Sequence, residues 1–210
     1  KVSPLDAVMI YEEFSELLPP DERGNKIVEE LTEHLVKADL LGRAGDLLNH
    51  QINHRLKGYD AFRVALRLAA IRLLDGQPDQ AIAVLNLADM RYRELPEELQ
   101  NEANHRNLSL LRANALSKQG HPDQALSMLA EMELTPQLNR LRAEIAWRAS
   151  YWDDAGEALN DVIIDQNISL TRPLDEKNMN LLMQRAIALN LASDRVALAN
   201  MREKYSDLMK

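Results

Sequence analysis

Apolar residues recur every three or four positions along nearly the whole chain, which is the period of an amphipathic α-helix. Ile27, Leu31 and Leu35, for example, follow one another at four-residue spacing. The period-two alternation of a β-strand is found nowhere over a useful length. The apolar run 162–164 is too short for a strand and lies inside a helical pattern. The pattern therefore predicts an all-α chain.

Proline and glycine divide this pattern into separate helices, because proline favours the first helical position and glycine the residue after the last turn. Asp75-Gly76 ends one helix and Pro78 opens the next, and Gly120 and Pro122 repeat that punctuation. We expect about eleven helices, with one longer loop over 166–173. They form an N-terminal helix over 1–21 and then five helix pairs over 22–57, 59–95, 96–133, 135–166 and 174–210.

A short sequence block occurs twice in the chain. Residues 76–85 read Gly-Gln-Pro-Asp-Gln-Ala-Ile-Ala-Val-Leu, and residues 120–129 read Gly-His-Pro-Asp-Gln-Ala-Leu-Ser-Met-Leu. A small residue also recurs early in the second helix of every expected pair, where it lets two helices approach closely. These residues are Ala44, Ala81, Ala125, Ala155 and Ala197. A helical unit that returns after a few tens of residues predicts an array of stacked helix hairpins.

In these turns the chain resembles the tetratricopeptide repeat family, in which a Gly-Asp-Tyr-like turn leads into a second helix that opens with Glu-Ala. The segment Tyr151-Trp152-Asp153-Asp154-Ala155 looks like an aromatic form of the same turn. The resemblance covers residues 22–210 and implies a right-handed superhelix (a solenoid) of antiparallel hairpins, in one domain over 1–210. Leu, Ile and Ala replace most of the aromatic pairs of that family, and the spacing is uneven. A general helical-hairpin solenoid therefore stays open as an alternative.

The resemblance also implies a binding surface, because in that family the first helices line a concave face that holds a peptide or a partner helix. Carried over, this geometry places eight residues on the concave side: Arg63, Arg67, Asn107, Asn114, Arg140, Glu144, Trp147 and Arg148. Arginine and tryptophan are frequent binding anchors, and several arginines favour a partner segment with acidic residues or a C-terminal carboxylate. The alternative is that the arginines pair with neighbouring acids and that Trp147 belongs to the core.

The charge balance argues against several other partners. The chain has 25 Lys and Arg against 33 Asp and Glu, a formal charge of -8, whereas nucleic acid or an anionic membrane surface needs a basic face. No apolar run approaches the roughly 18 residues of a membrane helix, so we expect no direct membrane insertion. The absence of cysteine and of an initiator Met fits a segment of a larger bacterial envelope protein as well as a cytoplasmic one, which leaves the compartment open.

Candidate chemistry is sparse. His50 and His54 stand four apart on one expected helix, a spacing able to chelate a metal, but the pattern supplies no third ligand and an exposed polar face explains them better. Adjacent acids such as Glu29-Glu30 point about 100° apart on a helix and form no catalytic dyad. With 7 glycines in the chain, a Gly-rich phosphate loop is absent. We expect no enzyme, no catalytic residue, no metal and no cofactor.

The sequence thus favours a non-catalytic scaffold or adaptor that binds a partner peptide or helix on its concave face. The alternative is a structural segment of a longer repeat array in a bacterial envelope-associated assembly, which packs on adjacent repeats or self-associates.

Overall fold

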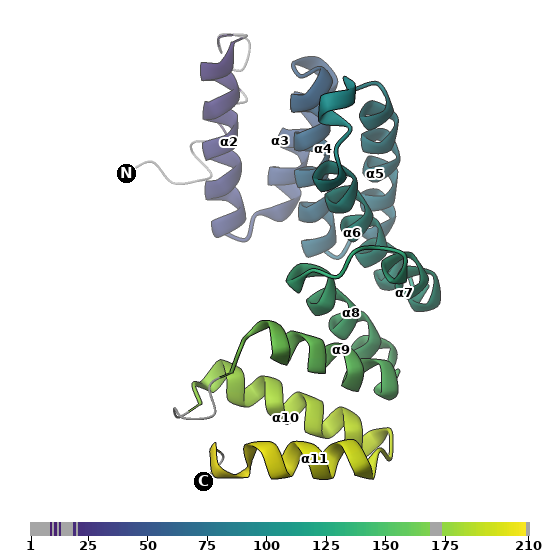
Figure 1. The fold of residues 1–210 in the computed structure, drawn as a ribbon. Helices are drawn as coiled ribbons and strands as arrows, with labels where there is room; N and C mark the ends of the chain where they lie inside the picture. Colours follow the sequence, from purple (N-terminus) through teal and green to yellow (C-terminus); the bar gives the residue numbers. More distant parts are fainter. Residues whose placement is uncertain are drawn as a thin grey trace. The chain divides into compact units, whose positions relative to one another are not determined.

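The computed structural model describes residues 21–168 and 174–208, together with positions 9, 11, 13 and 19. Within these residues the chain is entirely helical, without a strand, so the predicted all-α class is confirmed (Figure 1). The described helices are α2 (Glu22–Lys37), α3 (Leu41–His54), α4 (Gly58–Leu74), α5 (Pro78–Arg93), α6 (Glu102–Lys118), α7 (Pro122–Ala130), α8 (Pro136–Ala149), α9 (Trp152–Asp165), α10 (Glu176–Leu191) and α11 (Arg195–Tyr205), with short 3-10 helices η2 (Glu97–Leu99) and η3 (Ser206–Leu208).

Most helix boundaries lie within a few residues of the predicted ones, but the sixth helix begins later than expected. Pro96 is followed by η2 rather than by an α-helix, and α6 starts after Asn101, whose side chain accepts a hydrogen bond from the Asn104 amide at 3.0 Å. An Asn cap of this kind fixes the first turn of a helix more strongly than the proline upstream. The expected helix over 1–21 and the expected loop over 166–173 lie largely outside the described residues.

The first helix of each pair ends in the same way. The chain turns through a residue with a positive φ: Asp39 (59°), Gly76 (70°), Gly120 (88°), Ser150 (61°) and Ser193 (61°). In four of these turns the next backbone N–H then reaches back to a carbonyl five residues earlier: Leu40 to Leu35, Gln77 to Arg72, Tyr151 to Ala146 and Asp194 to Leu189, all at 2.8–2.9 Å. This is the left-handed helix cap that satisfies the last free carbonyls. The repeat seen in the sequence is therefore a repeat of turn geometry.

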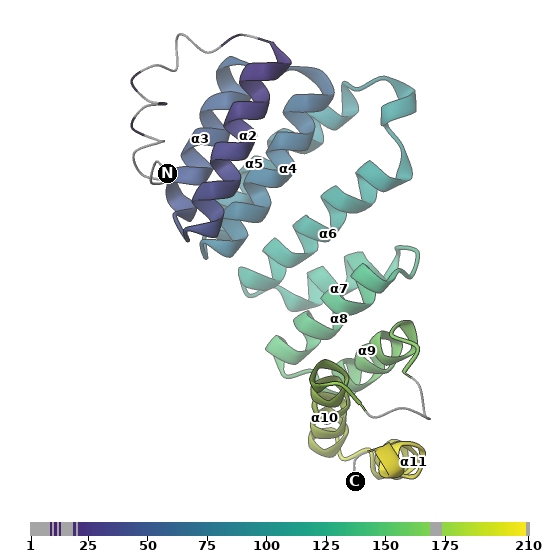
Figure 2. The ribbon, with the colours of Figure 1, turned by 90° about the vertical axis from the view of Figure 1, so that its left-hand side faces the viewer.

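The described chain forms two compact units, residues 1–119 and 120–210. In the first unit α2 packs on α3, α3 on α4, α4 on α5, and α6 on both α4 and α5. In the second unit α7 packs on α8, α8 on α9, α9 on α10 and α10 on α11 (Figure 2). The boundary falls between α6 and α7, so the expected pair 96–133 is divided between the units.

Four of the five small residues predicted at the hairpin contacts lie in the core. Ala44, Ala81, Ala125 and Ala155 are fully buried, and each stands five residues after a left-handed turn residue. The fifth, Ala197, is only half-buried and stands four residues after its turn residue, Ser193. The predicted stripe of α2 is wrong at one position: Ile27 is 48% exposed and Val28 is buried instead. The buried face of α2 contains Gly24, Val28, Leu31, Thr32 and Leu35. Its spacing of three and four residues rotates the stripe away from Ile27.

Candidate functional site

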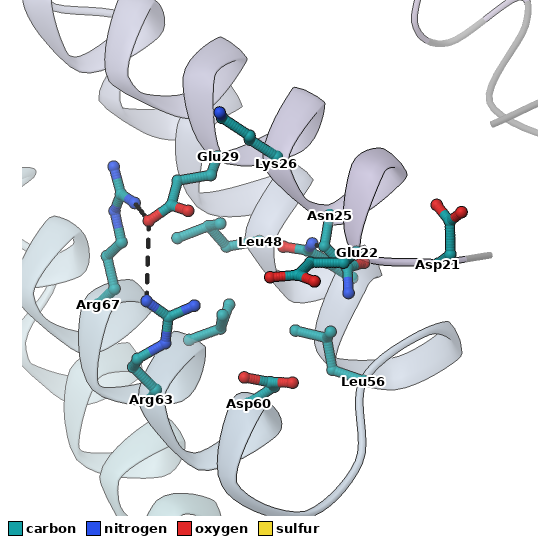
Figure 3. Close-up of a pocket in the computed structure, with 12 residues that line it drawn as sticks. Asp21, Glu22, Asn25, Lys26, Glu29, Leu48, Leu56, Asp60, Arg63 and Arg67 are labelled. Carbon is teal, nitrogen blue, oxygen red and sulfur yellow. Dashed lines mark hydrogen bonds and ion pairs between the residues drawn. The ribbon is translucent and has the colours of Figure 1, made fainter. Parts of the chain in front are cut away.

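A groove in the first unit lies between α2 and α4, over α3, and is called here the α2–α4 groove (Figure 3). Its volume is about 500 Å³. The floor comes from Leu48 and Gln51 of α3, with Leu56 beyond the helix end, and charged residues of α2 and α4 form the two walls. The wall residues are Asp21, Glu22, Asn25, Lys26, Glu29, Asp60, Arg63, Val64 and Arg67.

Ion pairs cross this groove from one wall to the other. Arg67 lies 3.1 Å from a carboxylate oxygen of Glu29 and 3.7 Å from one of Glu33, while Arg63 lies 3.9 Å from the same Glu29 oxygen (Figure 3). The two arginines predicted to bind a partner are thus already engaged by acids of the neighbouring helix. Their geometry matches the alternative given in the sequence analysis, that these arginines pair with neighbouring acids.

A second groove, the α8–α10 groove, lies in the second unit over α9. One cavity of about 490 Å³ contains all four residues predicted on the eighth helix, Arg140, Glu144, Trp147 and Arg148, together with the apolar residues Ala143, Leu159, Val162 and Leu181 and with Gln184. A second cavity of about 740 Å³ adjoins it, because the two share Arg140, Val162, Leu181 and Gln184. The second cavity continues along α10 to Asp175, Glu176, Lys177 and Asn180, and also contacts Gln166.

Several charges of the α8–α10 groove are used within the chain. Arg148 is hydrogen-bonded to Glu144 on the same helix, and Asp175 accepts a bond from the Asn178 amide at 2.7 Å as the cap of α10. Arg140, which lines both cavities, has no hydrogen bond or ion pair with any described residue. The guanidinium at the middle of the groove is therefore exposed and unneutralised by the described part of the chain.

Trp147 is the aromatic residue that lines this groove. Its ring packs edge-on against Trp152, with ring centroids 5.4 Å apart and an interplanar angle of 85°, and the side chain is half-buried. Nearer the start of α8, polar contacts hold this helix on α9: Asn139 donates to Asp165 at 3.0 Å and Arg142 lies 3.5 Å from Asp161. The groove thus has a supported aromatic wall rather than a loose side chain.

The two grooves occupy equivalent positions in two repeats. One fixed shift along the sequence aligns the turn residue Asp39 with Ser150 and the buried Ala44 with Ala155. The same shift aligns Leu48 with Leu159 and Gln51 with Val162 on the groove floors. It also aligns Glu29 with Arg140 on the first walls, which are formed by α2 and α8. A second shift, which aligns the turn residue Gly76 with Ser193, relates the second walls, which are formed by α4 and α10. There, Asp60, Arg63, Val64 and Arg67 correspond to Lys177, Asn180, Leu181 and Gln184. In each of these floor and wall pairs, both residues line the groove of their own unit.

The other predicted residues lie elsewhere in the first unit. Asn107 is exposed on α6, and Asn114 is half-buried there with its Oδ1 atom enclosed and unbonded among the described residues. The eight predicted residues are therefore divided between the two units. The α10 wall of the second groove was missed by sequence reasoning. The repeat register could have found Asn180 and Gln184, because it relates them to the predicted arginines Arg63 and Arg67 of α4.

A third cavity of about 290 Å³ lies on the other side of α10, beside Asp153, Glu157, Asp161 and Asp194. Arg185 is the cation among these acids, and burial lowers its pKa while Tyr205, Asp194 and Asp161 raise it. Among the described residues no three His, Cys, Asp or Glu side chains are placed to hold a metal ion. The His50 and His54 rings lie next to each other on α3, with centroids 4.6 Å apart and an interplanar angle of 41°.

None of the described helices is both long and apolar enough to cross a membrane. In comparisons with known proteins, no protein-family description matches the chain and no curated protein resembles it in sequence.

Proposed function

We propose that this chain is a non-catalytic protein-interaction module of tetratricopeptide-like helix hairpins, and that it binds its partner in the α8–α10 groove. One observation carries the proposal: Arg140, Glu144, Trp147 and Arg148 line one cavity together, with an apolar floor of Ala143, Leu159, Val162 and Leu181. An apolar floor with an aromatic anchor and a few charges at the rim is the usual composition of a peptide-binding groove.

The two other cavities are weaker candidates. In the α2–α4 groove, Arg63 and Arg67 are both engaged by Glu29, so a ligand would have to displace an internal ion pair. The cavity beside Arg185 is smaller and strongly acidic. A partner therefore gains most by binding in the groove that has an apolar lining and whose cation, Arg140, has no ion pair with a described residue.

The proposal is tested by site-specific photocrosslinking in the cells that make the protein. A benzophenone amino acid replaces Glu176, an exposed residue at the edge of the α8–α10 groove. The matched control carries the same group at Glu157, an exposed residue of the acidic cavity in the same unit. We expect an adduct with another protein from position 176 and none from position 157. Equal adducts from both positions, or none from either, would contradict the proposal.

The second candidate function, a structural segment of a longer array, has one observation in its favour. Met183, Ile187 and Leu191 form a stripe on three successive turns of α10 and are 47%, 46% and 50% exposed. An apolar stripe of this kind can pack on another repeat or on a second copy. An adduct of twice the 23.9 kDa chain mass from position 176 would support this function in place of partner binding.

A further inference from the structure

The two equivalent grooves differ in how their charges are balanced. In the α2–α4 groove the first wall presents the acid Glu29, and the second wall presents Arg63 and Arg67, which neutralise it. In the α8–α10 groove the first-wall position holds Arg140, and the two second-wall positions hold Asn180 and Gln184. The sign of the first-wall charge is therefore reversed, and no described residue pairs with it.

From this difference we infer that the α8–α10 groove binds a partner segment through an acidic side chain of that segment. This acid pairs with Arg140, just as Arg63 and Arg67 pair with Glu29 within the α2–α4 groove. The inference rests on the proposed function and names the chemistry of the partner. Guanidinium–carboxylate pairs are strong and directional because two N–H groups can donate to the two carboxylate oxygens.

The neighbours of Arg140 suit a carboxylate better than any other group. Asn180 and Gln184 carry neutral amides, whose NH₂ groups can donate to the same carboxylate without repelling it. Lys177 adds a second cation at the position where the other groove has Asp60. Three acids line the two cavities of this groove. Glu144 is hydrogen-bonded to Arg148 and Asp175 caps α10, while Glu176 makes no ion pair with Arg140.

Apolar surface beside Arg140 defines the rest of the partner segment. Leu159, Val162 and Leu181 line the same cavity as Arg140. The partner segment thus carries an acidic residue flanked by large apolar ones.

A displayed library of 12-residue peptides, randomised over Leu, Phe, Ala, Ser, Glu and Lys, tests this inference on the whole chain. The parent protein should enrich Glu over Lys beside Leu or Phe. The best-enriched peptide and its Glu→Gln isostere are then titrated against the parent, Arg140→Gln, Arg140→Lys and a control with Arg63→Gln and Arg67→Gln. We expect the isostere to bind the parent at least tenfold more weakly.

Arg140→Gln should remove the difference between the two peptides, Arg140→Lys should keep part of it, and the Arg63/Arg67 control should keep all of it. No enrichment of Glu over Lys by the parent, or a Glu preference that survives Arg140→Gln, overturns the inference. The photocrosslink from position 176 separates the two proposals. If the adduct forms equally well with Arg140→Gln, the proposed binding function stands and the acidic-partner inference is wrong. If the parent forms no adduct, the proposed binding function is itself wrong.

Discussion

The guanidinium group of Arg72 on α4 lies directly against the α-carbon of Gly45 on α3. A Cβ atom at Gly45 would come within 2.8 Å of Arg72 Cζ, closer than real Cβ contacts allow. Arg72 also donates to Asp46 at 2.9 Å and to Gln77 at 3.3 Å. The same contact recurs in the second unit, where a Cβ at Gly156 would lie 3.0 Å from Leu189 Cδ2. The sequence shifts that align the two grooves also align Gly45 with Gly156 and Arg72 with Leu189. These equivalent contacts therefore support the alignment independently of the grooves.

Gly45→Ala should destabilise the first unit. The new methyl group displaces a guanidinium whose side chain is 11% exposed and weakens two hydrogen bonds, for a net loss of about 1–2 kcal/mol of unfolding free energy. Gly42→Ala on the same helix is the matched control, because nothing lies within 4 Å of its Cβ and alanine favours helix. Urea denaturation followed by circular dichroism compares the two. A Gly45→Ala chain as stable as Gly42→Ala would contradict the close packing.

A leucine at the hairpin contact should overfill the core. Ala81→Leu places a large side chain at a fully buried position of α5, and we expect a loss of about 1–3 kcal/mol. Ala83→Leu, at an exposed position two residues further along the same helix, should change stability by less than about 0.5 kcal/mol. Equal melting temperatures for the two variants would show that position 81 is not a hairpin contact.

The Tyr151 hydroxyl should titrate above its ordinary pKa of 10.0. It donates a hydrogen bond to Asp123 at 2.8 Å, which is the largest cause of the raised pKa, and the charges of Asp123 and Asp154 act in the same direction. The bond therefore stabilises the fold below pH 10 and is lost as the pH rises through the raised pKa. The absorbance difference at alkaline pH between the parent and Tyr151→Phe measures this step. Asp123→Asn should move it back toward 10, and a parent step at or below 10 would contradict the contact.

The charge balance of the two grooves should be visible without any partner. A double-mutant cycle with Glu29→Gln and Arg67→Gln should give a coupling of about 0.2–1 kcal/mol, small because both side chains are partly exposed, and lower at high salt. The equivalent cycle in the second unit, Arg140→Gln with Gln184→Ala, should give a coupling close to zero. A coupling of the same size in both cycles would contradict the difference inferred between the grooves.

Sequence patterns predicted the helices and turns well because local interactions control both. The prolines of α5, α7 and α8 stand at the first helical position, and the turn residues Gly76 and Gly120 have a positive φ. The position of Ile27 was missed because the period of apolar residues fixes a helix face only to within one residue. Three of the turns use Asp39, Ser150 and Ser193, which give no glycine signal.

Only one wall of the candidate site could be predicted from the sequence. The α8 wall with Arg140 and Trp147 was expected from the resemblance to tetratricopeptide repeats, which implies that the first helix of each pair lines a binding surface. The pairing of Arg67 with Glu29 joins residues 38 positions apart, which no local pattern reports. The α10 wall becomes visible only when the turn register relates Gln184 to Arg67.

The most direct test of the account exchanges the chemistry of the grooves. Arg140→Glu, Asn180→Arg and Gln184→Arg together give the α8–α10 groove the charges of Glu29, Arg63 and Arg67. We expect the triple variant to fold, because the new residues can pair as they do in the first unit, and to lose the photocrosslinked partner at position 176. Crosslinking of the same partner in unchanged yield by the folded triple variant would contradict the assignment of this groove as the binding site.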